Sequence, residues 1–310
     1  MGSGWQPGSG LNVGERVGKM VDTLQAVAAW DKISPWLRAE FNNQLATPQA
    51  IGETVAQRQV RLKIGNISLR QNAVGDIVIE NSLHRFYHGH NGGSFTRAEV
   101  AAAIQKLSAT LGFDVSLCEL RRVDIGANLT GLDVQATLQA LTDYKGKRFL
   151  KYERGKGITG AKRLLTELEV KLYDKQRELA DKRQATLPTA TLRYELTSRK
   201  LSYIRKLGAV KVADLASPEF FTAASQELEA RLSACGFAEQ FSPDLLSADE
   251  LEALALVSSP LFAAYAANRA NKDRATRRRK LATQAREKAL LASPKADLLT
   301  RLKATLAELA

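Results

Sequence analysis

The sequence predicts an α+β fold, an antiparallel or mixed sheet with helices packed on one face, followed by an all-helical C-terminal region. Apolar and polar residues alternate, as in half-buried strands, over Val60 to Ile79 and again over Leu164 to Lys200. Helix-like spacing separates these stretches and returns from about Ser202 to the end of the chain. Strands that are grouped, rather than each followed by a helix, are typical of α+β domains.

The stretch from Leu164 to Lys200 contains two alternating segments that predict strands. One face of the first segment carries Leu168, Val170 and Leu172, and the other carries Glu169, Lys171, Tyr173 and Lys175. One face of the second carries Leu192, Tyr194 and Leu196, and the other carries Arg193, Glu195 and Thr197. If both strands lie in one sheet, its polar face gathers lysine, tyrosine, arginine and glutamate side chains.

Other segments predict further strands. Val60 to Ile79 predicts a meander that continues as a strand over Ser82 to His88. Cys118 to Ala127 and Arg148 to Arg154 are also typical of strands. Val21 to Trp30 is mostly apolar and fits either a strand or a short helix.

Two helices are predicted between the strands. Thr96 followed by Glu99 is a capping-box pattern, and it predicts a helix that runs to Leu111 and stops at Gly112. Leu132 to Tyr144 also has helical spacing of its apolar residues.

The composition shift near Gly208 predicts three regions: a flexible leader at 1–20, an α+β domain at 21–207 and a helical domain at 208–310. The leader has neither the charged segment nor the apolar segment of a signal peptide. No run of about 18 apolar residues occurs, so no membrane span is expected.

The net charge of +12 and the pI near 9.7 predict a polyanionic partner. Nucleic acid is the commonest such partner, and an anionic membrane surface is the alternative. Cys118 and Cys235 are the only cysteines, too few for a disulfide framework or a zinc cage, so a reducing cytoplasm is expected.

A site for phosphate chemistry is predicted on the polar face of the strands. Asp124 and Glu195 form a carboxylate pair suited to Mg²⁺ or Mn²⁺ if their strands are neighbours. Nearby lysines could neutralise a phosphate, and a tyrosine could attack one. The alternative is a solvent-exposed face with cross-strand ion pairs and no chemistry.

Short motifs in this region resemble those of the filamentous-phage gene II/X replication initiation proteins, whose motifs also recur in rolling-circle plasmid initiators. The resemblance covers about residues 60–210. The matching segments are Ser82-Leu83-His84-Arg85-Phe86-Tyr87-His88-Gly89, Arg122-Val123-Asp124-Ile125-Gly126-Ala127-Asn128, Tyr173-Asp174-Lys175-Gln176-Arg177-Glu178 and Leu192-Arg193-Tyr194-Glu195-Leu196.

The resemblance implies an enzyme that nicks and rejoins one DNA strand at an origin through a tyrosine-phosphate intermediate with a divalent metal. Roles are carried over onto matching positions. Tyr152 is the implied nucleophile, with Tyr173 and Tyr144 as alternatives. Asp124 and Glu195 are the implied ligands of Mg²⁺ or Mn²⁺, with Asn128 as a helper. Lys175 would neutralise the phosphate, supported by Arg193.

The implied partners are origin DNA, double-stranded and single-stranded, and the host helicase and polymerase. A basic segment between Asn268 and Lys288 predicts sequence-independent phosphate contacts. Its candidate DNA-binding residues are Arg274, Arg277, Arg278, Arg279 and Lys280. A solvated helix is the alternative for this segment.

Two rival functions stay open at the level of the sequence. The first is a non-catalytic DNA-binding protein that uses the basic C-terminal helices. The second is a histidine-metal nickase of the HUH type, because His88 and His90 would lie on one side of an extended segment, with His84 nearby.

Overall fold

The protein is described by a computed structural model over residues 20–46, 60–90, 92–155, 157–182, 187–238, 246–290 and 294–309. The predicted leader therefore lies outside the described residues except for Met20.

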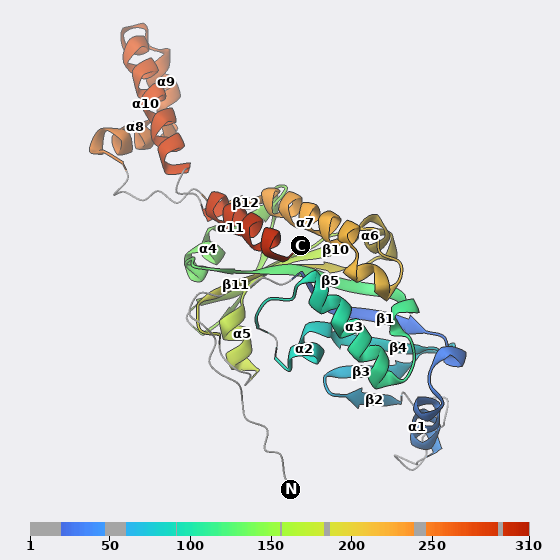
Figure 1. Cartoon of the computed structure of the whole chain (residues 1–310). Coiled ribbons are helices and arrows are strands. Elements are labelled where there is room, and N and C mark those ends of the chain that lie inside the picture. Colours follow the sequence, from blue (N-terminus) through green and yellow to red (C-terminus); the bar gives the residue numbers. More distant parts are fainter. Residues whose placement is uncertain are drawn as a thin grey trace, which may run out of the picture.

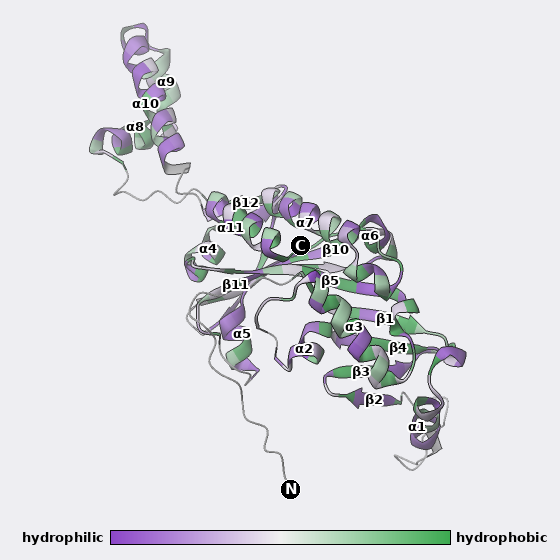
Figure 2. Ribbon diagram, viewed as in Figure 1, coloured by the Kyte–Doolittle hydropathy of each residue, from purple (hydrophilic) through white to green (hydrophobic). Residues whose placement is uncertain are grey.

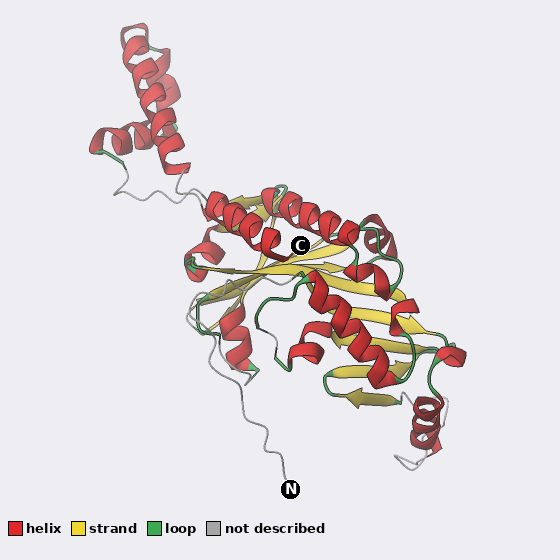
Figure 3. Cartoon of the chain, in the orientation of Figure 1, coloured by secondary structure: helices red, strands yellow, loops and turns green. Residues whose placement is uncertain are grey.

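A nine-stranded antiparallel sheet forms the centre of the described structure (Figure 3). Its strands, in spatial order, are β2 (Arg61–Ile64), β3 (Ile67–Gln71), β4 (Ile77–Ser82), β1 (Val21–Ala28), β5 (Glu119–Thr130), β11 (Thr191–Ser198), β10 (Leu168–Asp174), β9 (Gly157–Leu164) and β8 (Leu150–Arg154). The segments that alternate in the sequence thus meet as neighbours at β5, β11 and β10.

One face of β5, β11 and β10 is apolar, and helices cover it (Figure 1). Helices that contribute side chains to this core include α3 (Arg97–Leu111), α4 (Val134–Ala140), α6 (Leu201–Lys206), α7 (Pro218–Ser233) and α11 (Pro294–Leu309). The Tyr194 hydroxyl on β11 donates to the Leu228 carbonyl of α7 at 3.1 Å, which joins sheet and helix. The predicted α+β class is confirmed. In Figure 2, the helices that cover the sheet carry both hydrophobic and hydrophilic residues.

The start of α3 follows the predicted capping box. The Thr96 hydroxyl accepts from the Glu99 amide at 3.3 Å, and Glu99 accepts from the Thr96 amide at 2.7 Å. The helix ends at Gly112, whose φ of +71° is the left-handed conformation that glycine tolerates.

Two predicted elements are wrong. Ser82 to His88 is not a strand: Ser82 caps the short helix α2 (Leu83–His88), and its hydroxyl accepts from the Arg85 amide. The predicted helix of Leu132 to Tyr144 ends at Ala140. The chain continues as β6 (Leu141–Tyr144), because this segment pairs with β12 (Cys235–Phe237) and β7 (Lys147–Arg148) in a second sheet.

The C-terminal region contributes to two apolar clusters. Leucines of α7 and α11 belong to the core of the main sheet. By contrast, α8 (Ala248–Ser258) and α10 (Lys272–Leu290) build a small separate cluster, with α9 (Phe262–Ala267) between them in the chain. The predicted domain boundary at Gly208 stays a prediction.

Two further helices flank the polar face or the sheet edge. These are α5 (Lys175–Asp181), beside the polar face, and α1 (Pro35–Ala46), which follows β1. None of the described helices is long and apolar enough to cross a membrane.

Candidate active site

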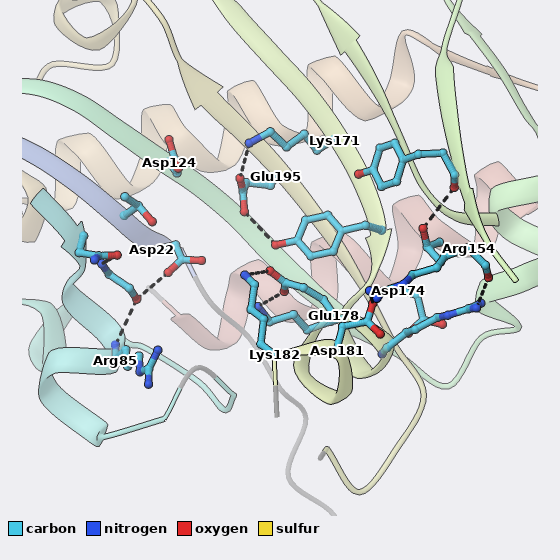
Figure 4. Close-up of a pocket in the computed structure, with 18 of the residues that line it drawn as sticks. Asp22, Arg85, Asp124, Arg154, Lys171, Asp174, Glu178, Asp181, Lys182 and Glu195 are labelled. Carbon is cyan, nitrogen blue, oxygen red and sulfur yellow. Dashed lines mark hydrogen bonds and ion pairs between the residues drawn. The ribbon is translucent and has the colours of Figure 1, made fainter. Parts of the chain in front are cut away.

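An open pocket of about 650 Å³ lies on the polar face of the sheet, between α2 and α5 (Figure 4). Its floor comes from β1, β5, β10 and β11, and the edge strand β8 with its neighbour β9 closes one side. Five residues that were predicted on separate segments therefore share one cavity: Asp124, Tyr152, Tyr173, Lys175 and Glu195.

Glu195 lies at the centre of the floor. It accepts hydrogen bonds from Lys171 Nζ at 3.0 Å and from the Tyr173 hydroxyl at 3.2 Å. The antiparallel register sets this contact by placing Lys171 opposite Glu195 on the neighbouring strand. Burial alone would raise the pKa of Glu195, but the charges of Lys171 and Arg193 outweigh it and lower that pKa. Glu195 is therefore ionised at neutral pH.

Asp124 lies on β5, one strand away from Glu195, and its side chain is almost fully buried. Arg122 donates to both of its carboxylate oxygens, at 2.9 and 2.7 Å. Burial, followed by repulsion from Glu195, nevertheless raises the pKa of Asp124 to about 6. The two carboxylates thus repel each other. Glu195 is ionised at neutral pH, whereas the pKa of Asp124 is about 6.

Arg193 lies behind the floor with no exposed surface. Its guanidinium donates to Asp22 Oδ2 and to Asn128 Oδ1, each at 3.3 Å, and its Nε lies 3.6 Å from Glu195. Gly126 leaves the room for this, because a Cβ there would lie 3.2 Å from Arg193 Cζ and 2.3 Å from the Tyr194 carbonyl oxygen. Arg193 is thus a buried cation that organises the acids around it.

Tyr152 stands on the edge strand β8, with 37% of its surface exposed. Its ring lies over Gly160 of β9, where a Cβ would come within 2.6 Å of the ring atoms. Burial, then the charge of Glu195, raises the pKa of Tyr152 to about 12. The phenol is therefore protonated at neutral pH, and it needs a base or a cation to act as a nucleophile.

The alternative tyrosines occupy different settings. Tyr173 is held by its hydrogen bond to Glu195, and burial, then that carboxylate, raises its pKa well above the usual value. Tyr144 is buried on β6, outside the pocket, and its hydroxyl accepts from Arg231 at 2.8 Å.

Lys175 begins α5 and turns its amine into the pocket wall, where it is 2% exposed. The amine donates to Glu178 at 2.6 Å and lies 5.8 Å from the centre of the Tyr173 ring. Figure 4 shows Lys182 beside the same carboxylate. The predicted phosphate-neutralising lysine is therefore in the pocket, but it is paired with an acid that the sequence analysis did not assign.

The donor types in the pocket suit a divalent cation. Asp22, Asp124 and Glu195 are carboxylates from neighbouring strands, and oxygen ligands are those that Mg²⁺ and Mn²⁺ prefer. Their present partners are cations, and among the described residues no three histidine, cysteine or acidic side chains are grouped tightly enough to hold a metal. Binding would therefore require Arg122, whose side chain is 42% exposed, to leave Asp124.

The three histidines lie beside the pocket and not in it. His84 and His88 are on helix α2 rather than on an extended segment, so the expected strand geometry of the HUH-type rival is wrong. The ring centres of His84 and His88 are 4.8 Å apart, and His84 is buried against Phe95. These rings are packed together as part of the structure around α2.

The predicted DNA-binding residues lie on α10, where some contact neighbouring helices and others are exposed. Arg278 faces α8 and pairs with Glu252 at 3.1 Å, and Arg279 lies over the Phe262 ring. Arg274, Arg277 and Lys280 are exposed. The predicted basic helix thus has one side that packs against its neighbours and one that carries accessible charge.

The chain is similar to a protein of known structure, although not to a described protein family. No protein-family model matches the chain, and no curated protein matches it. The solved structure of a rolling circle replication initiator protein from Geobacillus stearothermophilus is similar, with 13% sequence identity and a TM-score of 0.36. The match covers 72% of this chain and 87% of that chain. The chain resembles a rolling-circle replication initiator.

The structure thus brings Asp124, Glu195, Tyr152, Tyr173 and Lys175 to one pocket, with Arg193 behind its floor. Their catalytic and metal-binding roles stay predictions. Asp22, Arg85 and Glu178 also line the pocket, and they were not predicted as site residues from the sequence. A lone carboxylate within the apolar run of β1 was the available signal for Asp22, and the other two occur in the quoted motifs without a role.

Proposed function

We propose that this protein initiates DNA replication by nicking and rejoining one strand through a covalent tyrosine-phosphate intermediate, with Mg²⁺ or Mn²⁺ as cofactor. One observation carries the proposal: Tyr152, Tyr173, Lys175, Asp124 and Glu195 line the same open pocket. These residues combine candidate nucleophiles, a cation for a phosphate and carboxylates for a metal, which are the groups that phosphoryl transfer requires.

The proposed step starts with the hydroxyl oxygen of Tyr152 attacking a backbone phosphorus. A P–O bond to tyrosine forms, the P–O3′ bond breaks, and the leaving 3′-oxygen takes up a proton. The tyrosine proton passes to a carboxylate of the pocket or to water. The strand is rejoined by the reverse reaction, in which a 3′-hydroxyl attacks the phosphotyrosine. The free 3′-hydroxyl would prime a host polymerase, with a host helicase to open the duplex.

The charge balance of the pocket favours a requirement for a divalent ion. The described lining residues include seven carboxylates and six lysines or arginines. A phosphodiester would add negative charge to a cavity that has no surplus of positive charge. A bound divalent ion would polarise the phosphate and offset this charge, and Asp124 and Glu195, with Asp22 beside them, are the proposed ligands.

The DNA duplex around the nick would be held by α10. Exposed Arg274, Arg277 and Lys280 lie on this helix, which is mostly hydrophilic in Figure 2. Contacts of this kind track phosphates without reading sequence. The pocket and the basic helix together fit an enzyme that holds DNA by its backbone.

The proposal is tested with supercoiled plasmids that carry fragments of the DNA from which the gene comes. We expect nicked circles with Mg²⁺ or Mn²⁺, protein attached covalently to the 5′ end, and neither product with a chelator. Tyr265→Phe, a change on α9 away from the pocket, is the control for the tyrosine variants. DNA binding without any covalent adduct would favour the non-catalytic DNA-binding rival. Loss of adduct in His88→Ala, with Asp124→Asn still active, would favour the histidine rival.

A further inference from the structure

Arg85 lines the pocket, and no role was predicted for it from the sequence. It lies on α2, its side chain is exposed, and it lines the pocket from the wall opposite α5 (Figure 4). The other cations that line the pocket all have acidic or carbonyl partners. Lys171 pairs with Glu195, Lys175 and Lys182 with Glu178, Arg154 with Asp181, and Arg177 with the Arg154 carbonyl.

The guanidinium of Arg85 has no such partner within the described part of the chain. A cation that is already neutralised by a carboxylate binds a phosphate only by giving up that carboxylate. An exposed guanidinium without an acid partner can instead form two parallel hydrogen bonds to a phosphate at no such cost. Arg85 is therefore the lining cation best able to bind an anion without rearrangement.

The backbone of Arg85 is tied directly to the floor of the pocket. The Ser82 hydroxyl donates to Asp22 Oδ1 at 2.8 Å and accepts from the Arg85 amide at 3.2 Å, and Figure 4 shows both contacts. Ser82 thus connects α2 to a carboxylate that also contacts Arg193. The position of Arg85 relative to the acidic floor is set by two hydrogen bonds.

The rest of α2 is also anchored. His84 is buried against Phe95, and the Lys106 amine of α3 donates to the Tyr87 carbonyl at 3.2 Å. A rigid short helix that presents one unneutralised arginine to a pocket is suited to hold an anionic chain in a fixed place.

We propose that Arg85 binds a phosphodiester of the DNA strand next to the one that reacts, on the α2 side of the pocket. This rests on the proposed function for the identity of the anion, whereas the binding itself requires no chemistry. Arg85 would be a substrate-positioning residue that fixes which phosphate lies over the carboxylates.

Binding is measured first, with a fluorescent single-stranded oligonucleotide in the presence of a chelator, so that nicking plays no part. Arg85→Ala should weaken binding about tenfold, as for the loss of one arginine–phosphate contact. It should reduce the slope of log K against log salt by about 0.7. Arg85→Lys should keep the slope and lose part of the affinity. Arg205→Ala, an exposed arginine on α6, is the matched control and should behave as wild type.

A double-mutant cycle then locates the contact. In the nicked sequence, single phosphates are replaced one at a time by neutral methylphosphonates. One position next to the nick should weaken binding by wild type and leave binding by Arg85→Ala unchanged.

The outcomes separate the two proposals. If Arg85→Ala binds with the affinity and salt slope of wild type, the role of Arg85 is wrong, whatever the nicking assay shows. If the affinity and slope fall but wild type forms no covalent adduct, Arg85 is a phosphate-binding residue and the proposed chemistry fails.

Discussion

The Tyr173 hydroxyl donates to Glu195 at 3.2 Å although the two residues are 22 positions apart in the chain. This contact distinguishes the two tyrosines of the pocket. Tyr173 is already engaged by a carboxylate, whereas Tyr152 stands on an edge strand with its ring partly exposed. In the proposed reaction, an incoming phosphate would reach Tyr152 without breaking a hydrogen bond of the floor.

We expect Tyr152→Phe to abolish the covalent protein–DNA adduct and Tyr173→Phe to slow its formation without abolishing it. The reason is that only an accessible hydroxyl can attack, while loss of the Tyr173 hydroxyl changes the hydrogen bonding of Glu195. Adducts are counted on denaturing gels, with Tyr265→Phe as the control. An adduct that persists in Tyr152→Phe and disappears in Tyr173→Phe would reverse the assignment.

Asp124 predicts a specific pH dependence of stability. Its pKa is raised from 3.8 to about 6 in the folded state, so between these values the folded chain binds more protons than the unfolded chain. Through this residue, the free energy of unfolding rises as the pH falls from about 7 to about 4. Glu195, whose pKa is lowered, has the opposite sign and loses its contribution only at lower pH.

Asp124→Asn removes this titration. The stability of wild type relative to Asp124→Asn should therefore increase by about 1.5 kcal/mol between about pH 7.5 and about pH 5. Urea unfolding at the two pH values measures this difference. A constant difference between the two proteins would show that Asp124 has an ordinary pKa.

Removing the buried charge of Arg193 should lower the free energy of unfolding strongly. Arg193→Met leaves Asp22 without its buried cation and removes a positive charge from beside Glu195, and the expected cost is about 3 to 5 kcal/mol. Arg121→Met is the matched control, because Arg121 and its partner Glu119 are both 40% exposed. Its expected cost is below about 1 kcal/mol.

The double variant that combines Asp22→Asn with Arg193→Met shows whether the lost charge causes the loss of stability in Arg193→Met. It should recover part of the stability lost in Arg193→Met, because the uncompensated carboxylate is gone. Denaturant unfolding measures both effects. If the double variant is less stable than Arg193→Met, packing of the arginine side chain, and not its charge, accounts for the loss.

Arg277 and Arg278 are adjacent on α10 but differ in their surroundings, so their substitutions should change the salt dependence of duplex binding differently. Arg277→Ala should lower the salt slope of duplex binding by about 0.9, because its side chain is exposed. Arg278→Ala should change that slope less, because Arg278 is paired with Glu252. Equal effects of the two substitutions would show that the pairing with α8 does not hold when DNA is bound.

Elements whose signals are local could be predicted from the sequence. Thr96 and Glu99 specify the start of α3 through hydrogen bonds that span three residues, and the alternation around Val170 and Leu196 specifies two strands of the sheet. The polar faces of those strands, with Lys171 and Glu195, follow directly from the two-residue period.

The remaining elements and contacts depend on partners that are distant in the chain and meet only in the folded protein. Leu141–Tyr144 is a strand because β12, far along the chain, pairs with it, and local helical spacing gave no sign of that. Asp22 reaches the pocket where a register shift between Val21 and Leu24 interrupts the alternation of β1. Alternation assigns a side chain to a face of a sheet, but the order and register of the strands decide which side chains meet. Strand pairing brings Asp22 to Arg193, and the hydrogen bond from Ser82 to Asp22, 60 positions away in the chain, ties α2 and Arg85 to the floor of the pocket.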